Sequence, residues 1–141
     1  MSEYDEQAEE FLKKTNSKLE IVFVEYGIFD SFDDNNYRDI YRFTLSRKGC
    51  KKKLTDRFGQ SLHHSQGGEE PQKLRAYDVL SCLDGHEPGE YADWRAEFGY
   101  NDCKLSEYPK IWKIYDAVCR QYKILTSMYN EEELEMLNEI Q

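Results

Sequence analysis

Cys82 and His86 are the two side chains whose types and spacing come closest to a catalytic pair. On a continuous helix, residues four apart share a face, so the histidine could take the thiol proton and leave a nucleophilic thiolate. Gly85 and Pro88 favour the end of one helix and the start of another, which would separate the pair. We therefore predict no catalytic residues in this segment.

Other signatures of catalysis are missing from the sequence. It has no Walker motif, no dinucleotide-binding fingerprint and no H-E-x-x-H motif. Carboxylate pairs that could exchange protons are numerous in a chain with 28 Asp and Glu residues, so they indicate nothing specific. We expect a protein that is not an enzyme and that needs no cofactor.

The cysteines and histidines lack the spacing of a metal site. A structural zinc ion needs four converging ligands, and Cys82 with His86 supplies only one close pair. The four cysteines show no C-x-x-C spacing, which favours free thiols in a cytosolic protein. The acidic segment 30–36 lacks the glycine and the terminal glutamate of an EF-hand loop. We predict no metal.

Charge is unevenly distributed along the 141 residues, whose net charge is −9. Residues 18–62 carry nine basic against seven acidic side chains, whereas residues 63–141 carry eight basic against sixteen acidic ones. An acidic surface repels nucleic-acid phosphates and attracts basic surfaces, such as the nucleic-acid channel of another protein. We therefore expect a basic protein partner and no direct binding of nucleic acid.

The acidic half contains the side chains that we predict to contact this partner. Tyr91 and Tyr100 are candidate aromatic anchors, because tyrosine supplies both apolar area and a hydroxyl at interfaces. The candidate acidic contacts are Glu87, Glu90, Asp93, Glu97, Asp102, Glu107, Glu131, Glu132 and Glu135.

Basic side chains gather in a predicted hairpin, and two interpretations are open. They could contact phosphates, or they could form a lysine-rich edge strand that resists aggregation. We favour edge protection, because few aromatic side chains alternate with the bases on the exposed face. The residues concerned are Arg42, Arg47, Lys48, Lys51, Lys53 and Arg57.

A single α+β domain must position these residues, with a three-stranded antiparallel sheet, an N-terminal helix and a C-terminal helical part of about four helices. The sequence divides into an N-terminal helix at 1–17, the sheet at 18–62, a linker at 63–75 and the helical part at 76–141.

The three predicted strands differ in their patterns. Residues 19–29 include a continuous apolar run that is typical of a central strand covered on both faces. Residues 37–47 alternate, which directs Tyr41, Phe43 and Leu45 inward and places Arg42 outward. After a turn at Lys48–Gly49, residues 50–58 alternate poorly and suit an edge position or a β-bulge.

The long predicted helix, residues 107–127, has a broad apolar stripe that we interpret as core. We expect it to pack on one face of the sheet together with the N-terminal helix. Asn130 and Glu133 have the spacing of a capping box that starts a terminal helix, and Leu134 and Leu137 should dock it.

Several segments resemble a family of small proteins encoded by phages and prophages of gut Firmicutes. The resemblance covers most of the chain, including its acidic final helix. Its main segments are Ala76–Leu83, Pro88–Gly89, Glu97–Tyr100, Phe43–Arg47 and Phe58–Ser61. That family is chiefly uncharacterised, and the resemblance implies no catalytic residues.

The resemblance and the acidic helices together suggest a phage-derived inhibitor that blocks a bacterial defence nuclease, with a CRISPR effector favoured over a restriction enzyme. Its acidic surface would mimic nucleic acid in the cytoplasm of the host. The alternatives are a nucleic-acid-binding accessory protein that uses the basic hairpin, and a phage structural or assembly protein. No apolar run has the length of a membrane span, and both a monomer and a homodimer stay open.

Overall fold

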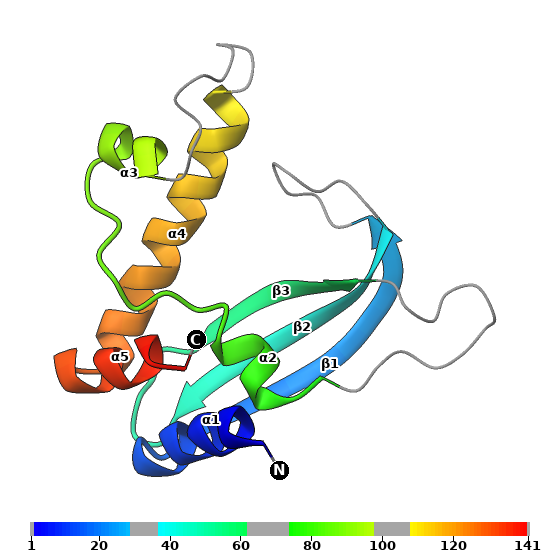
Figure 1. Ribbon diagram of the computed structural model, residues 1–141, viewed down its shortest axis with the longest axis vertical. Coiled ribbons are helices and arrows are strands. Elements are labelled where there is room, and N and C mark those ends of the chain that lie inside the picture. The colour runs from blue at the N-terminus through cyan, green and yellow to red at the C-terminus, as the bar shows by residue number, and fades with distance from the viewer. Residues whose placement is uncertain (1, 29–36, 62–73, 98–107, 141) are drawn as a thin grey trace.

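A computed structural model describes residues 2–28, 37–61, 74–97 and 108–140. It confirms the predicted α+β fold, a three-stranded antiparallel sheet with an N-terminal helix and a C-terminal helical part (Figure 1). The elements are α1 (Glu3–Lys14), β1 (Ser17–Ile28), β2 (Tyr37–Arg47), β3 (Leu54–Ser61), α2 (Ala76–Leu80), α3 (Tyr91–Glu97), α4 (Tyr108–Met128) and α5 (Glu131–Asn138).

The sheet has the order β1-β2-β3, so the prediction that the first strand is central was wrong. β1 lies at an edge, and its Val22 and Val24 keep 50% and 48% of their side-chain exposure. The apolar run of β1 does not reflect two covered faces. A register shift between Phe23 and Glu25 interrupts the alternation of the strand within this run. The prediction that the third strand is an edge strand is confirmed.

The central strand β2 alternates as predicted. Tyr41, Phe43 and Leu45 are buried on one face, and Arg42 is exposed on the other. β3 begins at Leu54, opposite Leu45, and therefore four residues later than expected. The turn at Gly49, where φ is +83°, is followed by a connection that pairs with neither strand.

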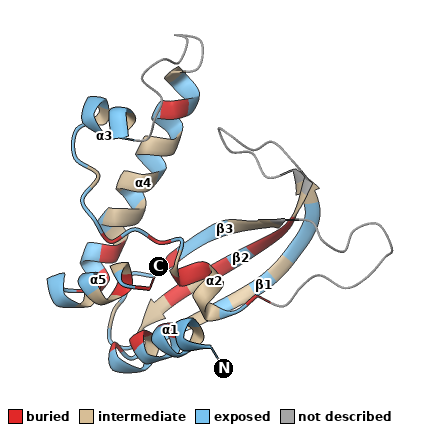
Figure 2. Ribbon diagram, in the orientation of Figure 1, coloured by how far each residue is buried: buried red, intermediate tan, exposed pale blue. Residues whose placement is uncertain are grey.

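One face of the sheet is covered by helices, and the core lies between them (Figure 2). Phe11 of α1, Leu80 of α2 and Leu137 of α5 pack into the same cluster as the inward side chains of β2. α1 ends where Asn16 adopts a positive φ of 54°, which turns the chain directly into β1.

α4 contacts this core only through its C-terminal end, so the expected packing of the long helix along the sheet was wrong. Leu125 and Met128 belong to the core cluster, whereas Tyr115 and Val118 of the predicted stripe are only partly buried. The helix extends away from the sheet, and α3 packs beside its N-terminal half (Figure 1). The apolar stripe of α4 therefore packs against α3 in its N-terminal half and against the core in its C-terminal part.

α5 has the predicted capping box. The Asn130 side chain accepts from the backbone N–H of Glu133, and the Glu133 carboxylate accepts from the backbone N–H of Asn130, at 2.9 and 3.0 Å. Leu134 and Leu137 are buried as expected. α5 thereby closes the core beneath the end of α4.

Candidate functional site

α3 is held against α4 by stacked aromatic rings. The Tyr91 ring centroid lies 4.9 Å from that of Trp112 and 5.2 Å from that of Tyr115, and Trp94 lies 5.4 Å from Tyr115. The Arg95 guanidinium lies over the Tyr91 ring at 5.4 Å. Tyr91, predicted as a free anchor for a partner, therefore attaches α3 to α4 and is only partly exposed.

Four of the predicted acidic contacts lie on α3 and on the segment before it. Glu87, Glu90, Asp93 and Glu97 are all exposed, and none takes part in an ion pair within the described part of the chain. Helix α3 begins at Tyr91, later than the Pro88 start that we expected. The predicted contacts Asp102, Glu107 and Tyr100 lie outside the described residues.

A second acidic group lies on α5. Glu131, Glu132 and Glu135 are exposed and, among the described residues, also form no ion pair. α3 and α5 lie beside opposite ends of α4 (Figure 1), whose 21 residues span about 30 Å. The structure thus collects the predicted acidic contacts into two groups along one rigid helix.

A cavity of about 280 Å³ lies between the α2–α3 connection and α4. It is lined by Asp84, His86, Glu87, Pro88, Trp94, Glu97 and Val118. His86 Nδ1 lies 2.7 Å from Asp84 Oδ1, and the Cys82 thiol donates to the carbonyl of Asp78 at 3.4 Å. Since α2 ends at Leu80, Cys82 and His86 do not share a helix, as the glycine and proline predicted.

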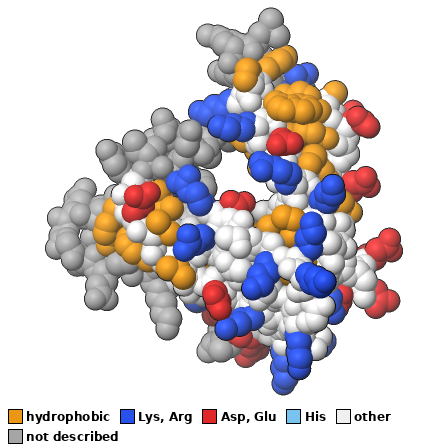
Figure 3. Space-filling view, turned by 180° about the vertical axis from the view of Figure 1, so that it is seen from behind, with side chains coloured by type: hydrophobic (Ala, Val, Ile, Leu, Met, Phe, Trp, Pro, Cys, Tyr) orange, Lys and Arg blue, Asp and Glu red, His pale blue; other side chains and the backbone are white. Residues whose placement is uncertain are grey.

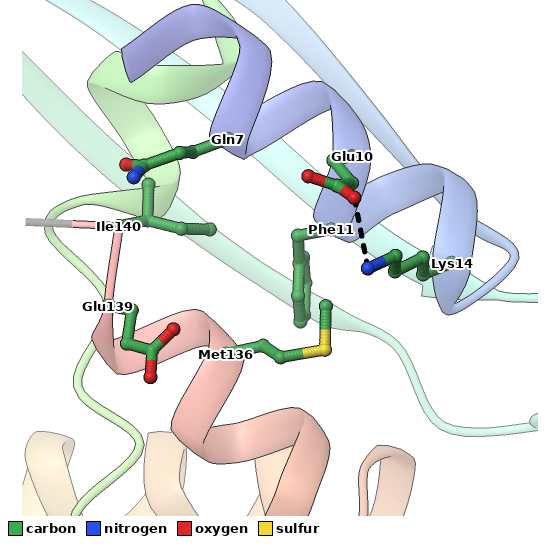
Figure 4. A pocket seen from close by; sticks show the side chains of 7 residues that line it. All are labelled: Gln7, Glu10, Phe11, Lys14, Met136, Glu139 and Ile140. Atoms are coloured by element: carbon green, nitrogen blue, oxygen red, sulfur yellow. Dashed lines mark ion pairs between the residues drawn. The ribbon is translucent and has the colours of Figure 1, made fainter. Parts of the chain in front are cut away.

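A smaller cavity of about 230 Å³ separates α1 from α5 (Figure 4). Phe11, Met136 and Ile140 line it with apolar atoms. The ion pair between Lys14 Nζ and Glu10, at 2.9 Å, lies at its side, as the dashed line shows. Its lining contains no nucleophile beside a base, so it has no arrangement for nucleophilic catalysis.

Arg47 does not belong to the exposed basic surface, which corrects our prediction. Its guanidinium donates to both carboxylate oxygens of Glu133 at 2.7 and 2.6 Å and to the carbonyl of Met128 at 2.7 Å. It also lies over the Tyr129 ring at 5.3 Å. These bonds hold the pKa of Glu133 below its usual value, mainly through the hydrogen bond from Arg47. Arg47 joins β2 to the start of α5.

The other predicted basic residues are exposed, and of these Arg57 lies on the edge strand β3. Arg42 lies on the central strand, directly opposite Arg57 of β3. Lys48, Lys51 and Lys53 precede β3 and lie in the connection between the strands.

The sequence analysis missed basic residues on α4. Lys113, Arg120 and Lys123 are exposed and share one side of the helix, since they are spaced by seven and three residues. This spacing predicts a basic side of the helix, whereas our interpretation of the helix used only the apolar stripe on its other side.

A buried carboxylate was also missed. Asp39 is fully buried on the inward face of β2, and neither of its oxygens has a hydrogen-bond partner in the described structure. Burial, and then the charge of Asp39, raises the pKa of the neighbouring Tyr41 hydroxyl. The alternation that directs Tyr41 inward also directs Asp39 inward, so the pattern contained this signal.

No group of three or more His, Cys, Asp or Glu side chains that could hold a metal ion occurs in the described ranges, and Cys50, Cys82 and Cys119 are free thiols. Within those ranges, none of the helices is both long and apolar enough to cross a membrane.

No protein-family model, curated protein or solved structure matches this chain. The functional argument therefore depends on the fold and on the arrangement of its charged surfaces.

Proposed function

We propose that this protein is a non-enzymatic, phage-derived inhibitor that binds a bacterial defence nuclease, with a CRISPR effector as the favoured target. The observation that carries the proposal is the pair of acidic groups on the α3 segment and on α5. Together they expose seven carboxylates of the predicted set: Glu87, Glu90, Asp93, Glu97, Glu131, Glu132 and Glu135.

These carboxylates suit a basic channel because no cation of the described structure neutralises them. An enzyme that handles nucleic acid lines its channel with Arg and Lys, and a surface of opposite charge accelerates association with it and favours correct orientation. Such an inhibitor occupies the channel without releasing a product and without a cofactor.

Rigidity adds to this argument. The aromatic contacts of Tyr91 and Trp94 fix α3 on α4, and the Tyr115 hydroxyl also donates to the Gly89 carbonyl at the start of that segment. A preorganised surface loses less conformational freedom on binding than a mobile one. The choice of a bacterial nuclease as the target follows from the phage and prophage resemblance inferred from the sequence alone.

The test is a plasmid-cleavage assay with a purified, guide-loaded CRISPR effector nuclease and increasing amounts of this protein. The variant E90K/D93K/E97K reverses three charges on the α3 segment, and E131K/E132K/E135K does so on α5. The matched control, E3K/E6K/E9K, reverses three exposed charges on α1.

We expect the wild type and the α1 control to inhibit cleavage, and the α3 variant to require at least about 10-fold more protein, because each replaced carboxylate becomes a repulsive contact in a basic channel. Inhibition that survives both the α3 and the α5 reversals would contradict the proposal. A pull-down from a Firmicutes lysate, with and without nuclease treatment, would identify targets beyond the enzyme chosen.

A further inference from the structure

The face of the sheet that no described helix covers carries a pair of arginines. Arg42 of β2 and Arg57 of β3 are direct partners in the strand register, and both side chains are exposed. Like charges placed opposite each other destabilise a sheet. An anion that binds both guanidinium groups would offset this repulsion.

Edge protection, which we favoured from the sequence, does not explain the arrangement. Edge protection accounts for Arg57, which lies on the edge strand β3, but not for Arg42, which lies on the central strand. Lys51, Lys52 and Lys53 lie before β3 begins, so they are not part of the edge either.

α4 extends the basic surface beyond the sheet. Its Lys113, Arg120 and Lys123 are exposed on one side of the helix, and α4 contacts β3 directly. Figure 3, seen from behind Figure 1, shows Lys and Arg side chains gathered over α4 and the adjoining sheet. We call this the basic face: Arg42, Lys48, Lys51, Lys52, Lys53, Arg57, Lys113, Arg120 and Lys123.

The acidic side chains near this face are Glu20, Glu25, Asp56 and Asp116, which are fewer than its nine basic residues. Glu20 pairs with Lys18 at 3.0 Å, and Asp116 pairs with Arg120 at 3.3 Å. Asp56 accepts the backbone N–H of Arg57 at 2.7 Å. The face therefore keeps an excess of positive charge.

We propose that the basic face binds the sugar–phosphate backbone of a nucleic-acid duplex. Thr44 and Ser46 follow Arg42 on the outward side of β2, and they can donate to phosphates but cannot stack on bases. Recognition of single strands depends on aromatic platforms, and the nine residues of the basic face include no aromatic side chain, so this surface fits the phosphates of a duplex.

The net charge of −9 does not prevent this binding. Charges farther apart than about 10 Å are largely screened at an ionic strength near 0.1 M. Arg42 and Arg57 lie on the sheet face that no described helix covers, whereas the exposed carboxylates of α3 and α5 lie on helices, so the local surface decides the contact (Figure 1).

This inference does not rest on the proposed inhibitory function, because it is tested with the purified protein and a duplex alone. The measurement is the fluorescence anisotropy of a labelled DNA duplex of about 20 base pairs, over about 0.05 to 0.2 M salt. The main variant is R42Q/R57Q, and K113Q/K123Q tests the contribution of α4. The control K13Q/K14Q removes the same charge from α1, which lies on the covered side of the sheet.

With about four phosphate contacts, the affinity of the wild type should fall about 100-fold across this salt range. R42Q/R57Q should weaken binding about 50-fold at 0.1 M salt and reduce the salt slope by about 2, since each lost contact releases one fewer counterion. K113Q/K123Q should act in the same direction, and K13Q/K14Q should stay within about 3-fold of the wild type.

Three results would overturn the inference. One is no binding of the duplex at the lowest salt. Another is an equal loss of affinity in R42Q/R57Q and K13Q/K14Q, which would indicate net charge alone. The third is tighter binding of a single strand of the same length, which would indicate base stacking in place of a duplex backbone. Circular dichroism confirms that each variant is folded.

Discussion

Replacing Glu133 with alanine should destabilise the fold more than any other change to an acidic side chain of α5. Glu133 receives both guanidinium bonds of Arg47 and also completes the capping box with Asn130. Its neighbour Glu132 lies in the same helical turn but is exposed. The pair E133A and E132A therefore separates the tertiary bond from helix propensity and net charge.

The magnitude follows from burial. An exposed ion pair contributes about 0–1 kcal/mol, and hydrogen bonds between charged groups contribute about 1.5–3 kcal/mol each. The Arg47 side chain keeps 26% of its exposure and that of Glu133 keeps 15%, which lies between these limits. Adding about 0.5–1 kcal/mol for the weakened cap, we expect E133A to lose about 2–3 kcal/mol and E132A less than about 0.5 kcal/mol.

Urea denaturation followed by far-UV circular dichroism measures both variants. A double-mutant cycle with R47M isolates the pair, and its coupling energy should exceed about 1 kcal/mol. If E133A retained the wild-type midpoint, or if the coupling were zero, Arg47 and Glu133 would not connect the sheet to α5 in the way the structure indicates.

Three further predictions concern the same fold. Because the folded-state pKa of Glu133 is depressed, its contribution is complete above its ordinary value of 4.5 and is lost as pH falls through the folded pKa, so the stability gap between wild type and E133A should narrow only in acid, in urea titrations at several pH values. G85A should lose about 1–3 kcal/mol, because an added Cβ would lie 2.8 Å from Asn138 Oδ1 and 3.1 Å from the Leu134 carbonyl; an unchanged thermal midpoint would contradict this close packing. D39L should stabilise the protein by about 1–3 kcal/mol in urea, because it removes a buried carboxylate without partners, and destabilisation would show that the carboxylate has a structural use.

The sequence predicted those parts of the fold in which a local pattern has one physical solution. Strict alternation in β2 can bury only one set of side chains, and Asn130 with Glu133 satisfies two backbone N–H donors at the start of α5. Such patterns do not depend on the rest of the chain, so the elements could be placed before their neighbours were known.

The order of the strands and the direction of α4 could not be predicted in this way. An apolar run such as the one around Val22 fits a central strand as well as an edge strand whose second face is open. The apolar stripe of α4 likewise predicts that the helix is covered along this side, but it does not show that α3 covers one end and the core covers the other. The order of the strands and the direction of α4 depend on which elements pack best against the core, and a local pattern does not contain that information.

The residues of the candidate site also separate into those that a local pattern predicts and those that depend on tertiary contacts. Exposed acids on α3 and α5 were predictable, because a short helix with one apolar side must turn its charges to solvent. The pairing of Arg47 with Glu133 was not predictable, since the two residues are 86 positions apart. That pair removed one arginine from the basic face, and the strand register placed Arg42 opposite Arg57.

The helices and the sheet together explain how one small chain can carry two surfaces of opposite charge. The core needs only one face of the sheet, so the strands can keep arginines on the other face without burying them. The acidic side chains lie instead on helices that have already used their apolar sides against the sheet or α4. Opposite charges therefore stay apart without neutralising each other. Both proposals depend on this separation, because the inhibitor needs accessible carboxylates and duplex binding needs accessible cations.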